Sequence, residues 1–324
     1  MRSPDERDSN EPRGSARFDI KGIAWGMCAV AAWASYNLGA KIGLADGFRP
    51  ADLTLLRYGG GGILFLPMFI RFGWRDLGGI GWLRGLVLTA LAGPIFGLLV
   101  NFGFVHAPLS HGVVLAPAAG ILVTIALTKI VDNAPVGLAK LLGAAMLVTG
   151  LIVLAGAPDA KAGHGASTQG MMLVGDASFF SSGSLWGGFT FLLKRWDCEA
   201  LRAAGTVGVL SGLAILPVWL ALSGGAPAPV DLKHVLAQLV IQGALGGCLG
   251  IVAYVAAVRR LGASTAALFP ALTPPVAIAL GIPLLHEYPS AIQLIGVVVA
   301  LCGIMIALGL FAKCGQPDRH GAAS

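Results

Sequence analysis

The sequence is short of charge. Asp, Glu, Lys and Arg make up 12% of its 324 residues, whereas soluble globular domains carry about 25%. Hydrophobic residues account for 56% of the chain, and they occur in long unbroken runs instead of the stripes of an amphipathic helix. This composition excludes an ordinary soluble domain, and we predict that the chain lies in a lipid bilayer.

The chain also lacks paired cysteines and metal-ligand patterns. Its five cysteines are scattered at Cys28, Cys198, Cys248, Cys302 and Cys314. None belongs to a Cys-x-x-Cys motif or has a histidine at ligand spacing, so we expect no disulfide, no metal and no cofactor. The net charge of +6 comes from basic residues spread over short connections, not from a basic patch with interleaved aromatics, so nucleic acid is not an expected partner.

Apolar runs long enough to cross a bilayer recur along the chain. A transmembrane helix needs about 20 apolar residues to cross roughly 30 Å of hydrocarbon, and irregular backbone cannot face lipid. We therefore predict an all-α integral membrane protein. The ten expected transmembrane helices lie at 20–42, 51–70, 80–104, 109–130, 135–156, 169–193, 203–223, 234–257, 263–286 and 289–311.

Lys and Arg are distributed unevenly over the connections. With the N-terminus in the cytoplasm, 17 of the 22 Lys and Arg fall at cytoplasmic ends of the spans. Four remain outside, at Lys41, Arg49, Lys161 and Lys233, and Arg57 lies within a span. The positive-inside rule therefore predicts that both termini are cytoplasmic.

The chain contains two copies of one five-helix unit, 153 residues apart. At this offset Trp33 aligns with Trp186 and Pro117 with Pro270. Because five is odd, the second copy enters the membrane from the opposite side, which makes an inverted repeat of the kind that alternating-access carriers use. We predict a disordered N-terminus, a first repeat, a periplasmic linker, a second repeat and a cytoplasmic tail at 1–19, 20–156, 157–168, 169–311 and 312–324.

Prolines interrupt equivalent spans of both repeats. Pro117 lies in the fourth span, and Pro270, Pro274 and Pro275 lie in the ninth. A proline within a helix frees the carbonyl four residues earlier, and broken helices line the substrate sites of carriers. We predict a substrate-facing role for these prolines, with a packing kink bridged by a neighbouring hydroxyl as the alternative.

Charged residues within the spans are rare. Arg57 and Asp176 lie about two turns into the second and sixth spans, where a charge must be offset and usually marks a functional site. We predict a polar vestibule in which they are partners or opposite walls; the alternative for Arg57 is that it snorkels to the interface. Asp176 and Glu287 are the candidates for coupling to a proton, although Glu287 could simply end its helix before Pro289.

Other polar and aromatic side chains fall at similar depth. The further candidates for lining a substrate cavity are Trp33, Asn37, Asn101, His111, Trp186, Tyr254 and Thr273. Two pairs of glycines with a spacing of four are instead typical of close helix packing. These are Gly93 and Gly97, and Gly246 and Gly250.

Several segments resemble the EamA-like carriers of the drug/metabolite transporter superfamily. They are R-Y-G-G at 57–60, F-P-A-L-T-P-P-V at 269–276, L-L-H-E-Y-P at 284–289 and G-V-V-V-A-L-C-G-I at 296–304, and the likeness covers roughly residues 20–311. Arg57, Pro117, Pro270 and Glu287 match the family pattern. A glutamate expected near the end of the fourth span is missing, and Asp132 is the acid that could stand in for it.

The resemblance implies a ten-helix carrier of the bacterial inner membrane that exports amino acids or other small metabolites through a central cavity. A single partly deep cation, Arg57, suits a zwitterionic or neutral substrate better than a sugar phosphate or nucleotide sugar. The alternatives are a multidrug or sugar carrier and, outside transport, an intramembrane enzyme or a membrane scaffold. We expect no enzymatic activity, contact with membrane lipid, and a monomer or weak homodimer.

Overall fold

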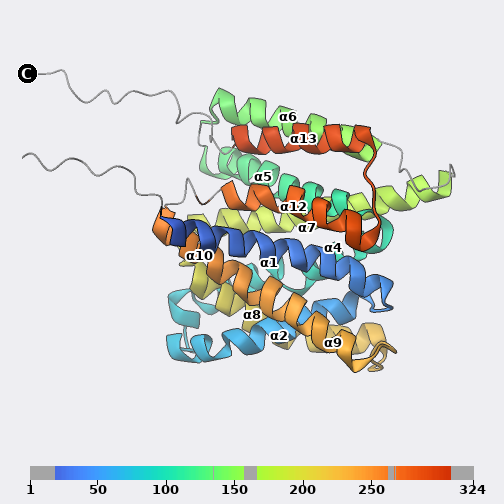
Figure 1. The fold of residues 1–324 in the computed structure, drawn as a ribbon. Helices are drawn as coiled ribbons and strands as arrows, with labels where there is room; N and C mark the ends of the chain where they lie inside the picture. Colours follow the sequence, from blue (N-terminus) through green and yellow to red (C-terminus); the bar gives the residue numbers. More distant parts are fainter. Residues whose placement is uncertain (1–18, 134, 157–165, 262–265, 267, 308–324) are drawn as a thin grey trace, which may run out of the picture.

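The computed structural model describes residues 19–133, 135–156, 166–261, 266 and 268–307, which are helices joined by short links (Figure 1). The predicted N-terminus, linker and C-terminal tail lie mainly outside these ranges, as do Lys161 and Cys314. The first repeat contains α1 (Ile20–Ala45), α2 (Pro50–Phe72), the 3-10 helix η1 (Leu77–Gly79), α3 (Trp82–Ala92), α4 (Pro94–His106), α5 (Leu109–Asp132) and α6 (Leu138–Gly156). The second contains α7 (Ala166–Arg195), α8 (Ala200–Ser223), α9 (Leu232–Gln238), the π-helix η2 (Leu239–Leu249), α10 (Gly250–Leu261), α12 (Leu268–Leu285) and α13 (Ala291–Ala307).

Some of these elements form continuous rods. Helices α3 and α4 make one rod with a break at Gly93 and Pro94, and α9, η2 and α10 make another. Within the described residues, five rods are long and apolar enough to cross a membrane, namely Pro50–Phe72, Trp82–His106, Leu109–Asp132, Ala200–Ser223 and Leu232–Leu261. The predicted all-α fold is therefore confirmed, while the number of ten spans and their orientation stay predictions.

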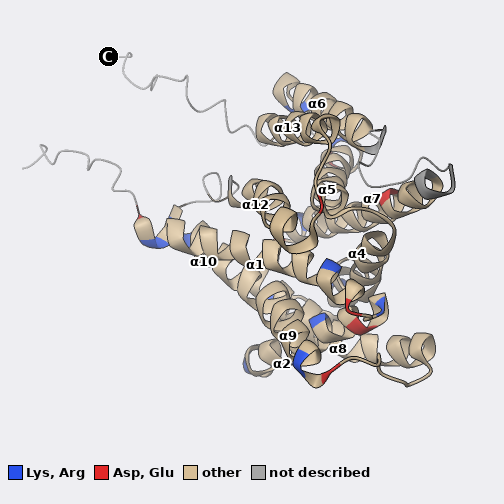
Figure 2. Cartoon of the chain, turned by 45° about the vertical axis from the view of Figure 1, so that its right-hand side comes forward, with Lys and Arg blue, Asp and Glu red and all other residues tan. Residues whose placement is uncertain are grey.

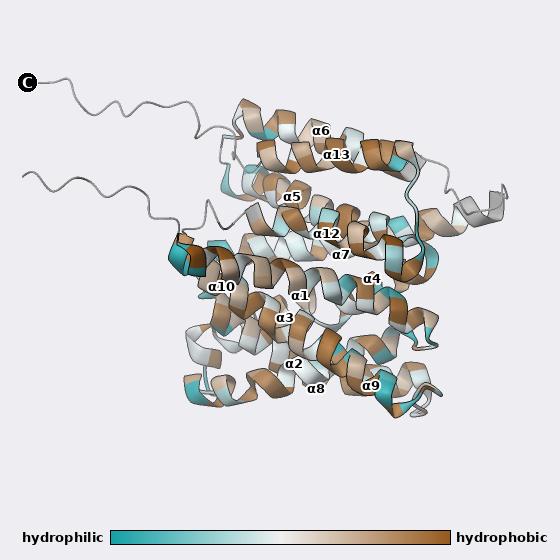
Figure 3. Cartoon of the chain, viewed as in Figure 1, coloured by the Kyte–Doolittle hydropathy of each residue, from teal (hydrophilic) through white to brown (hydrophobic). Residues whose placement is uncertain are grey.

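Apolar side chains cover the sides of the bundle. Most of the ribbon carries neither an acidic nor a basic residue (Figure 2), and hydrophobic residues run along the middle of the helices (Figure 3). Large aliphatic side chains such as Leu83, Ile63 and Leu213 are 79%, 70% and 70% exposed. An outer surface of this kind suits contact with lipid tails.

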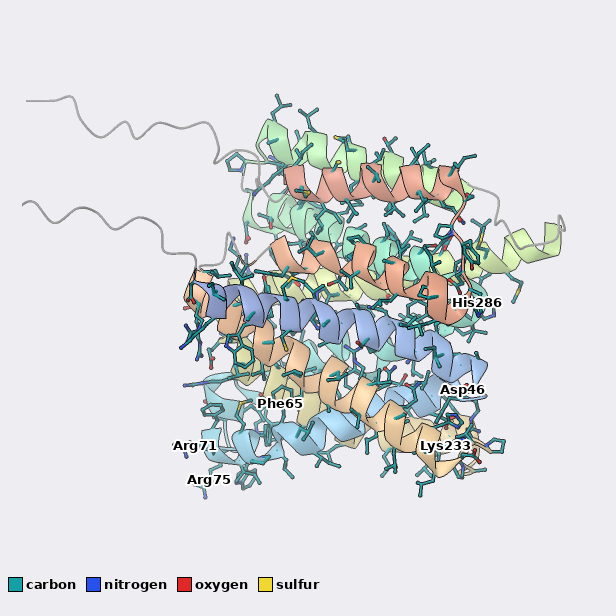
Figure 4. The ribbon with its side chains drawn as sticks, viewed as in Figure 1. Asp46, Phe65, Arg71, Arg75, Lys233 and His286 are labelled. Carbon is teal, nitrogen blue, oxygen red and sulfur yellow. The ribbon has the colours of Figure 1, made fainter. Side chains whose placement is uncertain are left out.

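The bundle has two ends, which we name after residues labelled in Figure 4. The Asp46 end holds the links after α1, α4 and α12, including His286, and the Arg71 end holds the links after α2, α5 and α7. Helix α1 ends where its counterpart α7 begins, and α5 begins where its counterpart α12 ends (Figure 1). The two repeats therefore run in opposite directions through the bundle.

Counterpart helices pack against each other through glycine. Gly296 and Gly303 of α13 face α6, where an added Cβ would lie 2.8 Å from the backbone nitrogen of Leu154 and 2.5 Å from that of Leu147, respectively. Helices α2 and α8 meet in the same way, since a Cβ at Gly62 would lie 2.8 Å from a carbonyl oxygen of α8. In a bilayer, small residues at such contacts allow the backbones to approach closely.

A leucine at Gly296 should separate α6 from α13, because the backbone of Leu154 cannot move aside like the tip of a side chain. Overpacking of this kind costs roughly 1–3 kcal/mol, so we expect a lower melting temperature in detergent. Gly170→Leu in α7 is the control, because no described atom lies within 4 Å of a Cβ at that position. Equal melting temperatures for the two variants would contradict the packing.

Candidate functional site

Arg57 of α2 points into a cluster of aromatic rings inside the bundle. Its guanidinium carbon lies 3.9 Å from the centroid of the Tyr36 ring and 5.6 Å from those of Tyr58 and Phe96. Both tyrosines are buried. The side chain therefore faces α1 and α4, and the snorkelling interpretation is wrong.

The guanidinium of Arg57 has no anionic partner among the described residues, and its Nη1 is buried without a hydrogen bond. Cation–π contact with an aromatic face stabilises a cation away from water, but it does not satisfy the N–H donors of Nη1. An unpaired charged donor at this depth is costly, and a carboxylate is the group that it binds best.

The rings around Arg57 continue into both repeats. The Phe96 ring lies 5.5 Å from that of Trp186 in α7, and Trp33 of α1 lies 5.6 Å from Tyr254 of α10. The two tryptophans occupy equivalent positions of the repeats, and both are half-buried within the bundle. They stay candidates for the walls of a substrate cavity.

The π-helix η2 forms the wall beside Arg57. A Cβ at Gly247 would lie 3.0 Å from the carbonyl oxygen of Arg57, so only glycine lets this backbone come so close. Gln242 of η2 donates to the carbonyl of Tyr36 at 3.3 Å, while its own Oε1 is buried without a partner. Long π-helical segments are rare and often accompany functional sites.

The two predicted packing pairs of glycine lie at helix contacts. Gly246 and Gly250 make room for Tyr36 and Trp33, which approach within 2.8 and 2.5 Å of an added Cβ. In the first repeat, the nearest neighbours lie on α2 for Gly97 and include Ser211 of α8 for Gly93. These glycines therefore accommodate side chains of neighbouring helices.

Asp176 of α7 pairs with His111 of α5, so the predicted pairing of Asp176 with Arg57 is wrong. The Oδ1 atom of Asp176 lies 2.8 Å from Nδ1 of His111, and both side chains are buried. On the other side of the imidazole, Nε2 lies 3.4 Å from Nε2 of Gln293 in α13. The second carboxylate oxygen, Oδ2, is buried without a hydrogen bond.

Glu287 ties several helices together at the Asp46 end. Its Oε2 accepts a hydrogen bond from the backbone nitrogen of Leu109, the first residue of α5, at 2.8 Å, and its Oε1 lies 3.7 Å from Nζ of Lys41. The same ammonium donates to the carbonyls of Phe104 and Ala107 at 2.8 and 2.6 Å. Glu287 is thus more than the last polar residue after a helix, since it holds the start of α5 to α1.

A hollow of about 240 Å³ opens beside this network. Residues of α1, α4, α5, α12, α13 and the link between α12 and α13 line it, and they include Lys41, His106, Ser110, Glu287 and Gln293. Gln293 therefore connects the hollow with the buried His111. The hollow lies at the Asp46 end, away from the rings around Arg57.

The Arg71 end carries an ion pair of its own. Asp132, the last residue of α5, pairs with Arg195, the last residue of α7. Helices α5 and α7 are the counterparts of α12 and α1, which Glu287 and Lys41 join at the opposite end. Asp132 therefore holds in the first repeat a place similar to that of Glu287 in the second, and both ends of the bundle are tied by equivalent helices.

The remaining candidates are placed differently from the prediction. Helix α5 continues through Pro117, which is exposed, and α12 continues through Pro274, so the expected interruptions there are wrong. Prolines are tolerated in such helices because neighbouring groups satisfy the freed carbonyls. Pro270 is half-buried, and Thr273 is buried with its hydroxyl unpaired.

Two asparagines among the candidates make local contacts. The side chain of Asn37 donates to the carbonyl of Trp33 on its own helix at 2.8 Å, and that of Asn101 donates to Thr54 of α2 at 3.0 Å. Asn101 is fully buried with a free Oδ1, so it stays a candidate polar group of the interior.

Several contributors were missed by sequence reasoning, among them Gln242 of η2. Tyr36 and Phe96 stack around Arg57, and Gln293 contacts His111. A signal existed for Gln293, because a lone amide in an apolar span needs a buried partner. Tyr36 lies about one helical turn after Trp33, which places both on one face of α1 and could have drawn attention to it.

Three findings relate this chain to known proteins. The EamA-like transporter family matches residues 20–156 and 173–309, two stretches that begin 153 positions apart. A curated relative from Streptantibioticus cattleyicolor, described as a probable terminal-alkyne amino-acid exporter, is 28% identical over 304 residues, or 91% of this chain and 97% of the relative.

A crystal structure of a protein with 17% sequence identity superposes with a TM-score of 0.61 and covers 91% of this chain and 99% of that one. At this identity it shows a common fold alone. The family match spans both repeats and confirms the resemblance read from the sequence. The chain belongs to the EamA-like transporter family of the drug/metabolite transporter superfamily.

Proposed function

We propose that this protein is a secondary transporter that exports an amino acid, or a similar zwitterionic or neutral metabolite, from the bacterial cytoplasm across the inner membrane. One observation carries the proposal: Arg57 is a guanidinium stacked on aromatic rings with no carboxylate partner among the described residues. The carboxylate of a substrate would pair with it. The description of the relative as a probable amino-acid exporter supports the same class of substrate.

The groups around Arg57 suit the rest of an amino acid. The rings of Phe96 and Trp186 offer apolar surface for a side chain, and the free Oε1 of Gln242 is an acceptor for an ammonium group. A sugar phosphate needs several cations to offset its charge, and Arg57 is the single cation in this ring cluster. A carboxylate with an apolar side chain is therefore favoured over a phosphorylated sugar.

Ten spans in two inverted repeats allow this site to face either side of the membrane in turn. The positive-inside rule puts the Arg71 end in the cytoplasm, because 17 of the 22 Lys and Arg then lie inside. The pair of Lys41 and Glu287 closes the outer end, and the pair of Asp132 and Arg195 closes the inner end. Transport requires that the two pairs open one at a time.

Substitution of Arg57 should weaken ligand binding. In a detergent thermal-shift assay with a panel of L-amino acids, we expect at least one apolar amino acid to raise the melting temperature of the wild type by mass action. Arg57→Gln should weaken binding of that ligand by roughly tenfold to a hundredfold, since a hydrogen bond to a charged group contributes about 1.5–3 kcal/mol. The exposed Lys233→Gln is the control variant.

The ligand itself supplies a second control for Arg57. The primary amine that lacks only the carboxyl group of the best amino acid should give no thermal shift, because it leaves the guanidinium unpaired. Counterflow of the same amino acid in proteoliposomes should be lost in Arg57→Gln and kept in Lys233→Gln. An undiminished thermal shift in Arg57→Gln, or a shift with sugar phosphates alone, would overturn the proposed role.

A covalent bridge across the outer end should stop transport. We expect a cysteine pair at Lys41 and Glu287, joined by a short reducible bifunctional reagent in a background without native cysteines, to lose most of its counterflow and regain it on reduction. A pair at Asp231 and Lys233, another ion pair at 3.6 Å, is the matched control. Equal transport by both bridged proteins would show that the contact of Glu287 need not open.

Labelling of Cys198 tests the orientation. In a variant that retains only this cysteine, a maleimide should react from the cytoplasmic side, whereas Lys233→Cys in a cysteine-free background should react from outside. Burial raises the pKa of the Cys198 thiol, and since the thiolate is the reactive form, labelling should speed up as the pH rises from about 7 to about 8.5. The reverse sidedness would overturn the predicted topology.

A further inference from the structure

We propose that His111 and Asp176 form a proton-binding site that is reached from the hollow at the Asp46 end, and that binding of a proton there releases this end of the bundle. The site itself stands independently of the substrate. Its coupling to export, as an exchange of a proton for the metabolite, rests on the proposed function.

The orientation of Gln293 favours one tautomer of a neutral His111. Its Oε1 accepts a hydrogen bond from the backbone nitrogen of Ser290 at 2.8 Å, so its NH₂ group faces Nε2 of His111 at 3.4 Å. An NH₂ group can only donate, so this hydrogen bond is made when Nε2 is an unprotonated acceptor. The proton of the neutral imidazole then lies on Nδ1 and is donated to the carboxylate of Asp176, 2.8 Å away.

A proton added to Nε2 of His111 removes this contact with Gln293. Two donors would then face each other, and the amide would have to turn so that Oε1 meets the imidazolium. In turning, Gln293 gives up the backbone nitrogen of Ser290. The carboxylate of Asp176 stabilises the new charge, and its free Oδ2 retains capacity to accept a further hydrogen bond.

The bond given up by Gln293 belongs to the start of α13. Ser290 and Gln293 form a capping box, in which the Ser290 hydroxyl accepts from the backbone nitrogen of Gln293 at 3.2 Å while the Gln293 side chain binds back to Ser290. Ser290 lies three residues after Glu287. Loss of the hydrogen bond from Ser290 to Gln293 therefore loosens the link between α12 and α13, whose Glu287 holds α1 and α5 together.

The hollow provides the route for the proton. Gln293 lines the hollow, together with Ser110, and lies between it and His111. The other titratable side chains around the site are Lys41 and Glu287, which contact each other, Tyr288, which lines the hollow, and His106, whose Nδ1 lies 3.0 Å from the carbonyl oxygen of Phe102 on its own helix. Asp176 is the charged group that touches His111 among the described residues, so it defines where the proton is held.

Protonation of His111 can be measured without any substrate. In full-length protein labelled with isotopic histidine, NMR should show a neutral His111 with its proton on Nδ1 at high pH and an imidazolium after acidification. His111→Gln identifies the signal. In the isosteric Asp176→Asn variant, the imidazolium should no longer form on the same acidification.

A merely structural pair would give a different result. It would lower the melting temperature of Asp176→Asn but leave the pH response of His111 unchanged, or His111 would stay neutral throughout. Either result would overturn the proposal.

Release of the Asp46 end has its own readout. A cysteine pair at Val105 and Tyr288, two residues that line the hollow from α4 and from the link before α13, should be bridged several-fold less by a short bifunctional reagent at pH 5 than at pH 8. The decrease should exceed that of a control pair at Asp231 and Lys233, and Gln293→Met should abolish the difference. Equal pH dependence of the two pairs would refute the release.

Failure of the proposed function and failure of the proton coupling can be told apart. If no amino acid is transported while His111 titrates and the bridging depends on pH, the proton site stands and the substrate class is wrong. If an amino acid is transported but an acid exterior fails to drive its efflux from proteoliposomes in the wild type, the coupling is refuted. Asp176→Asn should keep counterflow and lose this acid-driven efflux.

Discussion

Lipid tails offer no hydrogen bonds, so a buried polar group in this bundle gains a partner only from the protein or from what the protein binds. Even the helix ends and breaks obey this constraint. The Tyr58 hydroxyl donates to the carbonyl of Ala92 at 2.7 Å, directly before the break between α3 and α4, and Lys41 satisfies the last carbonyls of α4. Arg57 differs from these groups, because its guanidinium has no carboxylate partner among the described residues and would need one from a bound molecule. His111 and Asp176, by contrast, satisfy each other.

The framework of the protein is symmetric, whereas its chemistry is not. Glycine contacts between α6 and α13, and between α2 and α8, join counterpart helices and make the two repeats pack as equivalents. The ion pairs at the two ends follow this symmetry. At the offset of 153, however, Arg57 corresponds to Leu210 and Asp176 to Ile23. A symmetric shell can expose one central site to either side, and an asymmetric site can still bind its substrate in a single orientation.

The sequence predicts the depth of a residue better than the direction in which it points. Run lengths and the repeat were enough to predict the all-α fold, and the rarity of charge singled out Arg57, Asp176 and Glu287. The pairing of Arg57 with Asp176 failed because their side chains point to different neighbours, which depends on how helices far apart in sequence are packed. The prediction that prolines interrupt the helices failed for a similar reason. Helices α5 and α12 continue through their prolines, whereas the glycine-rich segment η2 is the irregular helix beside Arg57.

The two ends of the bundle are not held equally. At the Asp46 end, Lys41 and Glu287 are 19% and 26% exposed and make further hydrogen bonds to the backbone of α4 and α5. At the Arg71 end, Asp132 and Arg195 are 35% and 44% exposed, and water screens such pairs strongly. Arg259 with Glu199 and Arg260 with Asp19 add two further ion pairs at this end, and they are exposed as well, so the contacts at the Arg71 end are individually weaker than those at the Asp46 end. With that end in the cytoplasm, a resting carrier would load its substrate from inside, and opening of the more firmly held outer end would need an input such as the binding of a proton at His111.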